Sequence, residues 1–216
     1  MHRSINNLIE IEKEIHSKNL DFKSKVKIIA VSKTFSIENI LPLIEYGHTD
    51  FGENKVQEAI DKWSKIKSRN INLHMIGKLQ TNKVKFAVSL FDYIHSLDSI
   101  KLAKKISEEQ NKIKKNIKIF IQVNIGSEIQ KSGINIDELP QFYKTCTQDF
   151  NLNIIGLMCL PPVKIDPSNY FREIKNAADR LSLKNLSMGM SSDYLKAIQF
   201  KANFIRIGSK IFGSRN

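Results

Sequence analysis

The stretch IIAVSKTF, from Ile28 to Phe35, places a lysine directly after a short run of apolar residues. Four apolar residues followed by Ser32 are typical of a buried β-strand that ends at this point. Lys33 then stands at the carboxyl end of the strand. It either caps the strand in solvent or presents an amine inside a pocket, where partial desolvation lowers the pKa of a lysine and favours Schiff-base chemistry.

Seven further strand-like segments follow, separated by amphipathic helical patterns such as SIENILPLIEYG, in which Ser36 can cap a helix and Gly47 can end it. The eight strand candidates are Lys27–Ser32, Thr49–Gly52, Leu73–Ile76, Tyr93–Ser96, Ile117–Asn124, Ile154–Leu160, Asn185–Met188 and Phe204–Ile207. Eight strands that alternate with helices predict an α/β fold, a closed (β/α)₈ TIM barrel, with a doubly wound open sheet as the alternative. We expect one domain, residues 1–216, with an extra N-terminal helix before the first strand.

The composition is that of an ordinary globular protein, with 41% hydrophobic and 26% charged residues. No apolar run reaches the roughly 18 residues of a membrane span. Acidic and basic residues interrupt the N-terminal segment, which predicts an amphipathic helix and not a signal peptide. Cys146 and Cys159 are too few for a disulfide framework and match no metal-ligand spacing. A cytoplasmic location is therefore expected.

A net charge of +12 raises the question of nucleic-acid binding. Only 6 of the 34 basic residues are arginines, the residue type favoured for bidentate phosphate and base contacts. The lysines are spread along the chain without the interleaved aromatic residues of a single-strand binder. Composition therefore favours a role other than nucleic-acid binding.

In a TIM barrel, active sites gather at the carboxyl ends of the strands. Several candidate site residues follow the predicted strands there: Lys33, Glu53, Asn54, Lys78, Asp98, Met190 and Ser191. Two small-residue turns, around Gly189 and at Gly208–Ser209, follow the seventh and eighth strands, where phosphate sites of barrels are often built. Arg206 interrupts the last apolar strand, and a buried charge there requires a partner. These parts indicate either pyridoxal phosphate or a Schiff-base aldolase, and the residues alone leave both open.

Seven sequence blocks in this order resemble the YggS/PROSC family of pyridoxal phosphate homeostasis proteins. The blocks are AVSKT (Ala30–Thr34), FGENKVQE (Phe51–Glu58), LHMIGKLQTNK (Leu73–Lys83), KSGI (Lys131–Ile134), GLMCLPP (Gly156–Pro162), LSMGMSSD (Leu186–Asp193) and RIGSKIFG (Arg206–Gly213). The resemblance covers nearly the whole chain, from Lys27 to Gly213. It implies a single barrel like the amino-terminal domain of alanine racemase.

The resemblance also implies roles for individual residues. Lys33 would carry pyridoxal 5'-phosphate as an internal aldimine, with Asn54 beside the ring. The phosphate would be held by Ser187, Met190, Ser191, Gly208 and Ser209. Arg206 would face the pyridine nitrogen; because an arginine does not readily give up a proton, the ring would stay unprotonated and act as a weaker electron sink.

The implied function is a carrier of the cofactor in the cytoplasm, without an evident catalytic activity of its own. An incoming amine or amino acid would displace Lys33 by transimination, with apo forms of cofactor-dependent enzymes as recipients and the protein acting as a monomer. The chain ends three residues after Gly213, so we expect no second domain for two-base racemisation; a one-base, racemase-like enzyme on a small amino acid is the alternative. His74 and His95 lie in apolar strand contexts typical of barrel histidines. Lys78 departs from the family pattern, and we expect it at the surface.

Overall fold

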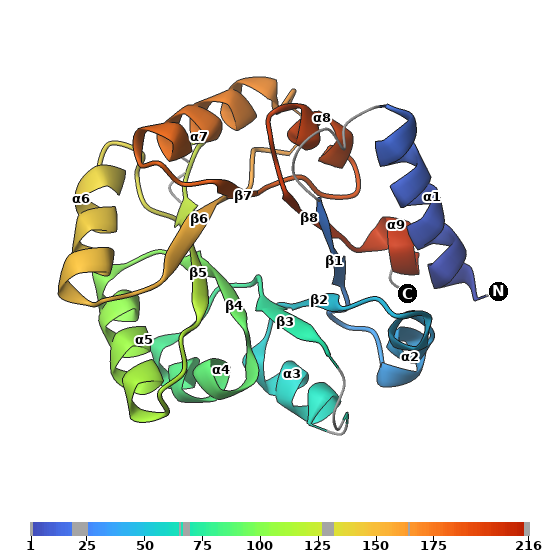
Figure 1. Ribbon diagram of the computed structural model, residues 1–216, viewed down its shortest axis with the longest axis horizontal. Coiled ribbons are helices and arrows are strands. Elements are labelled where there is room, and N and C mark those ends of the chain that lie inside the picture. The colour runs from blue at the N-terminus through green and yellow to red at the C-terminus, as the bar shows by residue number, and fades with distance from the viewer. Residues whose placement is uncertain are drawn as a thin grey trace.

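Eight parallel strands pair in sequence order, and the last pairs with the first, so that the sheet closes into a barrel (Figure 1). This computed structural model describes residues 2–18, 26–64, 66, 70–126, 132–163 and 165–213; Lys131 of the KSGI block lies outside them. The strands are β1 (Lys27–Val31), β2 (Asp50–Glu53), β3 (Asn72–Met75), β4 (Tyr93–Leu97), β5 (Lys118–Val123), β6 (Ile154–Cys159), β7 (Asn185–Ser187) and β8 (Phe204–Ile207). The predicted barrel is confirmed, and each predicted strand coincides with an observed one within two residues at either end.

Helices surround the barrel and connect successive strands (Figure 1). They are α1 (Arg3–Ser17), α2 (Ile37–Tyr46), α3 (Val56–Trp63), α4 (Val84–Leu90), α5 (Ile100–Lys112), α6 (Leu139–Lys144), α7 (Ser168–Arg180), α8 (Tyr194–Gln199) and α9 (Ser209–Phe212), with a 3₁₀ turn η1 (Thr81–Lys83) and a π-helical turn η2 (Thr145–Asp149). None of the helices within the described ranges is both long enough and apolar enough to cross a bilayer.

The helix boundaries follow local sequence signals. Gly47 ends α2 in a left-handed conformation, as predicted, with φ of 99°. Ser99 caps α5 by accepting a hydrogen bond from the backbone N–H of Leu102. Ser36 occupies the N-cap of α2, but its side chain makes no capping bond and instead accepts from the Asn39 amide at 3.0 Å.

The extra N-terminal helix α1 is confirmed. Leu8, Ile11 and Ile15 repeat at helical spacing and are buried, so one face of α1 packs on the barrel layer. Figure 1 shows α1 beside α9 at the edge where both chain ends lie. Asn7 Nδ2 donates to the carbonyl of Ile211 at 2.8 Å, which ties the first helix to the segment that follows β8.

Two apolar clusters fill the structure. The larger cluster lies between the strands and the helices, whereas the smaller one contains strand residues only: Ile29, Tyr93, Phe120, Met158 and Phe204. Since successive side chains of a strand point to opposite faces, the smaller cluster fills the barrel interior. Side chains of the same parity continue toward the carboxyl ends of the strands and form the floor of a cavity there.

Candidate functional site

A cavity of about 620 Å³ lies at the carboxyl ends of the strands. Seven of the eight residues predicted for the cofactor site line it: Lys33, Asn54, Met190, Ser191, Arg206, Gly208 and Ser209. They come from the ends of β1, β2, β7 and β8, which are far apart in sequence and become neighbours through closure of the barrel. A volume of this size suits a small-molecule ligand.

A polar cluster holds the backbone on both sides of Lys33. Its members, hereafter the Glu53–Lys62 cluster, are Ser32, Glu53, Glu58, Lys62 and Trp63. Glu53 Oε1 accepts from Ser32 Oγ at 2.8 Å, and Lys62 Nζ donates to the carbonyl of Ser32 at 2.8 Å. Glu53 Oε1 also accepts from Lys62 Nζ at 2.9 Å and from Trp63 Nε1 at 3.0 Å. The residue before Lys33 is therefore fixed through its side chain and its carbonyl.

The residue after Lys33 is held in an unusual conformation. Thr34 has φ of 69°, which is rare for a β-branched residue. Its backbone N–H donates to Glu58 Oε1 of the Glu53–Lys62 cluster. Strained residues of this kind persist where their surroundings fix them, and they gather at functional sites. The half-buried Lys33 thus emerges from a rigid turn, a different environment from a frayed strand end in solvent.

Arg206 lies at the floor of the same cavity and is 5% exposed. Its Nη1 donates to Ser187 Oγ at 2.6 Å and its Nη2 to the carbonyl of Cys159 at 2.9 Å. Burial lowers the pKa of the guanidinium to about 10, so the group stays charged at neutral pH. Among the described residues it forms no ion pair with a carboxylate, and the cavity therefore has a cationic donor at its floor.

Two short loops form the side of the cavity that is next to α8 and α9. Ser191 Oγ accepts from the backbone N–H of Lys210 at 3.3 Å, which joins the loop after β7 to the start of α9. The backbone N–H of Met190 donates to Asp193 Oδ1 at 2.6 Å and is used within its own turn. The hydroxyls of Ser191 and Ser209 and the backbone at Gly208 are the groups that these loops offer to an anion.

Ser187 is the one predicted residue that does not line the cavity. It is fully buried at the end of β7, and its side chain points into the barrel beneath Arg206. Its hydroxyl bonds Arg206 and, at 2.8 Å, His95 Nδ1. In this structure the Ser187 hydroxyl supports Arg206 from the barrel interior, and its expected contact with a phosphate stays a prediction.

Lys78 is exposed after β3, as expected. A smaller cavity of about 340 Å³ adjoins the main one there, and the two share Asn54, Ile76 and Leu160. His74 and His95 are completely buried and hydrogen-bonded, in agreement with the expected barrel histidines. Within the described part of the chain, no group of His, Cys, Asp or Glu residues is arranged to hold a metal ion.

A larger cavity, of about 940 Å³, lies at the opposite end of the barrel between α1 and the starts of β1 and β2. Its lining includes Lys13, Lys27, His48 and Asp50. Because chemistry in such barrels occurs at the carboxyl ends of the strands, its size does not make it the active site. We assign the candidate site to the cavity of about 620 Å³ at the carboxyl ends of the strands, where Lys33 and Arg206 lie together.

Sequence reasoning missed part of this arrangement. Glu53 was recognised only as a strand-end residue, and Lys62 was not singled out. The spacing of Glu58 and Lys62 is visible in the sequence, but on a helix it is typical of an ordinary exposed i,i+4 pair.

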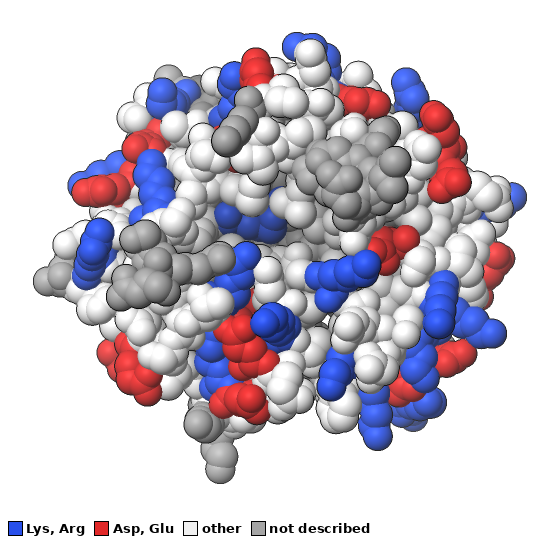
Figure 2. Space-filling view, turned by 180° about the vertical axis from the view of Figure 1, so that it is seen from behind, with Lys and Arg blue, Asp and Glu red and all other residues white. Residues whose placement is uncertain are grey.

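Figure 2 shows basic side chains in and around a hollow near the centre of the face opposite to that in Figure 1. Acidic side chains lie among them, and the excess of basic residues in the whole chain, a net charge of +12, favours anionic ligands.

Residues 11–216 match the family of the alanine racemase N-terminal domain. Pyridoxal phosphate homeostasis proteins similar to this chain include that of Pasteurella multocida, 36% identical over 97% of each chain. That of Buchnera aphidicola subsp. Schizaphis graminum is 39% identical over 87% of this chain and 86% of the relative.

Solved structures give the same result. PipY of Synechococcus elongatus PCC7942 without PLP is 30% identical, with a TM-score of 0.89 over 98% of this chain and 100% of PipY. PipY with PLP bound is 32% identical, with a TM-score of 0.80 over 93% of this chain and 99% of PipY. Alanine racemase of Clostridium difficile 630, 14% identical with a TM-score of 0.75 over 99% of this chain and 56% of that one, supports the fold alone. The chain therefore belongs to the YggS/PipY family of pyridoxal phosphate homeostasis proteins, built on the alanine racemase N-terminal barrel.

Proposed function

We propose that this chain, as a single domain, binds pyridoxal 5'-phosphate in the strand-end cavity and buffers or delivers the cofactor. The observation that carries the proposal is that one cavity of suitable size brings together the amine of Lys33, the guanidinium of Arg206 and two small-residue loops. The relative PipY has been solved with PLP bound, at 32% identity. Together the site chemistry and the family favour this cofactor over a Schiff-base aldolase.

The residues of the cavity fit the groups of this cofactor. A ligand phosphate would lie at Ser191, Gly208 and Ser209, since barrels commonly place phosphate at the loops after strands seven and eight and at a short extra helix, here α9. Arg206 would donate to the pyridine nitrogen from the floor. Asn54, which follows β2 and lines the same cavity, would contact the ring. Ser187 would act through Arg206.

Lys33 would hold and release the cofactor. When bound, the cofactor supplies an aldehyde carbon with which a primary amine condenses, losing one water. An incoming amine or amino acid then takes the place of Lys33, which leaves as a free amine, so the exchange balances without an oxidant or reductant. The turn from Ser32 to Thr34 places Lys33 in the lining of the cavity, and binding there would keep the free concentration of a reactive aldehyde low.

The cavity favours a carrier over an enzyme. Lys33 and Arg206 are the only ionisable side chains among the described residues of its lining, and Arg206 is a poor proton donor. Racemisation with two bases would require a second ionisable group facing Lys33, which leaves one-base exchange as the alternative activity. We further propose that the protein acts as a monomer in the cytoplasm, where Cys146 and Cys159 stay reduced, and that apo enzymes receive the cofactor.

The test is the visible absorbance of the purified protein with pyridoxal 5'-phosphate, followed by borohydride reduction and peptide mass mapping. We expect a coloured adduct that reduction fixes on the peptide containing Lys33. Lys33→Ala should abolish it, whereas Lys78→Ala, a control at an exposed strand-end lysine, should retain it. Label scattered over surface lysines in both variants would refute the proposal. Exchange of the α-proton of amino acids in deuterated water would identify the one-base enzyme instead.

A further inference from the structure

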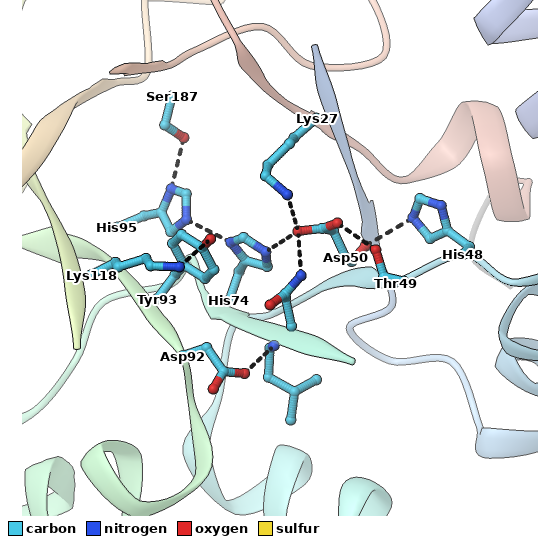
Figure 3. Close-up of polar contacts among 12 residues, drawn as sticks. Lys27, His48, Thr49, Asp50, His74, Asp92, Tyr93, His95, Lys118 and Ser187 are labelled. Atoms are coloured by element: carbon cyan, nitrogen blue, oxygen red, sulfur yellow. Dashed lines mark hydrogen bonds and ion pairs between the residues drawn. The ribbon is translucent and has the colours of Figure 1, made fainter. Parts of the chain in front are cut away.

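A continuous line of hydrogen bonds runs through the barrel interior from Ser187 to Asp50 (Figure 3). Its members, hereafter the interior line, are Ser187, His95, His74 and Asp50. Ser187 Oγ lies 2.8 Å from His95 Nδ1, and His95 Nε2 lies 3.0 Å from His74 Nδ1. His74 Nε2 lies 3.0 Å from Asp50 Oδ1. The line thus connects the floor of the strand-end cavity with the opposite end of the barrel.

The residues at the two ends of the interior line determine which atom donates and which accepts in each hydrogen bond along it. Arg206, which bonds Ser187, can only donate hydrogen bonds, and the carboxylate of Asp50 can only accept them. Ser187 therefore accepts from Arg206 and gives its single hydroxyl proton to His95 Nδ1. Each imidazole must then accept at Nδ1 and donate at Nε2, so both histidines are the Nε2–H tautomer.

The surroundings keep both imidazoles neutral. Burial lowers the pKa of His74, although Asp50 opposes the shift, and lowers the pKa of His95 well below its ordinary value. The other charged groups that act on the pair are Lys27 and Asp92 near His74 and Arg206 near His95. Aromatic rings enclose the imidazoles: His74 stacks on Tyr93 at 4.2 Å and His95 on Phe120 at 4.3 Å between ring centroids.

The far end of the line is anchored by polar contacts at the starts of β1, β2 and β3. Asp50 accepts from Thr49 Oγ1 at 2.7 Å, from Asn72 Nδ2 at 3.3 Å and from Lys27 Nζ at 3.4 Å. Although burial raises the pKa of the Asp50 carboxyl, His74, Thr49 and Lys27 together hold it well below its usual range. A fixed anion therefore ends the line, and its negative charge balances the buried guanidinium at the other end.

We propose that the residues of the interior line are positioning residues that hold the Arg206 guanidinium in one orientation at the floor of the cavity. With its proton committed to His95, Ser187 presents only a lone pair to Arg206. If the hydroxyl hydrogen of Ser187 pointed toward Arg206 instead, the guanidinium would lose this acceptor and would no longer be held in place. The inference rests on the proposed function for its consequence, which is that Arg206 remains a fixed donor toward the cofactor ring.

The first experiment uses the protein without cofactor, so that its result is independent of the proposed function. Long-range ¹⁵N–¹H NMR of the histidine rings reports which nitrogen carries the proton, and His74→Asn and His95→Gln identify the two sets of signals. We expect the neutral Nε2–H form for both rings from about pH 6 to 8, whereas an unpaired imidazole would titrate near 6.5. An imidazolium or an Nδ1–H form in either ring would overturn the direction of the line.

The second experiment measures affinity for pyridoxal 5'-phosphate and the absorbance maximum of the bound cofactor. His95→Phe interrupts the line with a ring of similar size, and Phe120→Leu is the control that loosens the same packing without touching the line. Because His95→Phe removes the acceptor that orients the Ser187 hydroxyl, we expect it to weaken binding about 10-fold or more and to shift the absorbance. His95→Gln, which can still accept and donate, should recover part of the affinity.

The outcomes separate the two proposals. If the wild-type protein does not bind the cofactor, the proposed function fails, while the NMR result still decides the direction of the line. If the wild type binds and His95→Phe binds and absorbs like Phe120→Leu, the positioning role is overturned and the proposed function stands. Ser187→Ala supplies a second variant, with a smaller volume change, should His95→Phe fail to fold.

Discussion

The buried Glu53–Lys62 cluster gives a stability prediction that can be worked from the structure. Lys62→Met retains the length of the side chain and removes the ammonium, which lies 2.9 Å from Glu53 Oε1. Lys62 is 8% exposed and Glu53 is fully buried, so the variant leaves a carboxylate without its cation in the interior. Breaking a buried pair in this way costs about 3–5 kcal/mol, a large share of the stability of an ordinary domain.

A second substitution tests the cause of the loss. Glu53→Gln removes the charge and keeps an acceptor for Ser32 and Trp63. If the unpaired carboxylate is the cause, the double variant Lys62→Met/Glu53→Gln should be more stable than Lys62→Met by about 2 kcal/mol or more. Because Ser32 precedes Lys33, we also expect Lys62→Met to reduce cofactor binding at Lys33.

The assay is equilibrium unfolding in urea, followed by fluorescence and by far-ultraviolet circular dichroism. Trp63 is the sole tryptophan of the chain and belongs to the cluster, so its emission reports the site directly. Lys175→Met is the matched control, since Lys175 forms an i,i+4 pair with the exposed Asp179, and its loss should stay below about 1 kcal/mol. A loss below about 1 kcal/mol for Lys62→Met, or a double variant no more stable than the single one, would refute the reasoning.

Three further predictions concern other parts of the chain. Gly189→Ala should lower the free energy of unfolding by about 2 kcal/mol or more, because φ is 91° and the added Cβ would lie 2.7 Å from another side chain. Gly47→Ala, where the added Cβ meets open space, should cost about 1 kcal/mol, and equal losses in urea unfolding would contradict the prediction. The pKa values of His74 and His95 are lowered in the folded protein, so below about pH 6.5 the unfolded chain binds more protons than the folded one. The urea concentration at the midpoint of unfolding should therefore be lower at pH 5 than at pH 7.5, and an equal midpoint at the two pH values would contradict this prediction. Burial raises the pKa of the Cys159 thiol to about 12, so iodoacetamide at pH 8 should modify it only after unfolding; rapid labelling of the native protein would show the burial to be wrong.

Local sequence patterns were enough to predict the barrel and the position of Lys33 at a strand end. Eight short apolar runs with helical patterns between them predict alternating strands and helices, because burial imposes a period of about two on strands and 3.6 on helices. Lys33 follows the first run, so its place at the carboxyl end of β1 needed only local information. The same reasoning placed Gly208 after the last strand.

The way in which side chains from distant segments face one another is visible only in the folded barrel. Ser187 and His95 are 92 residues apart and bond inside the barrel, and Lys62 reaches back 30 residues to the carbonyl of Ser32. Such contacts depend on closure of the sheet, on the register between strands and on the parity of each side chain. Periodicity specifies the elements but carries no record of these pairings, so the Glu53–Lys62 cluster, the place of Ser187 and the interior line appear only in the folded chain.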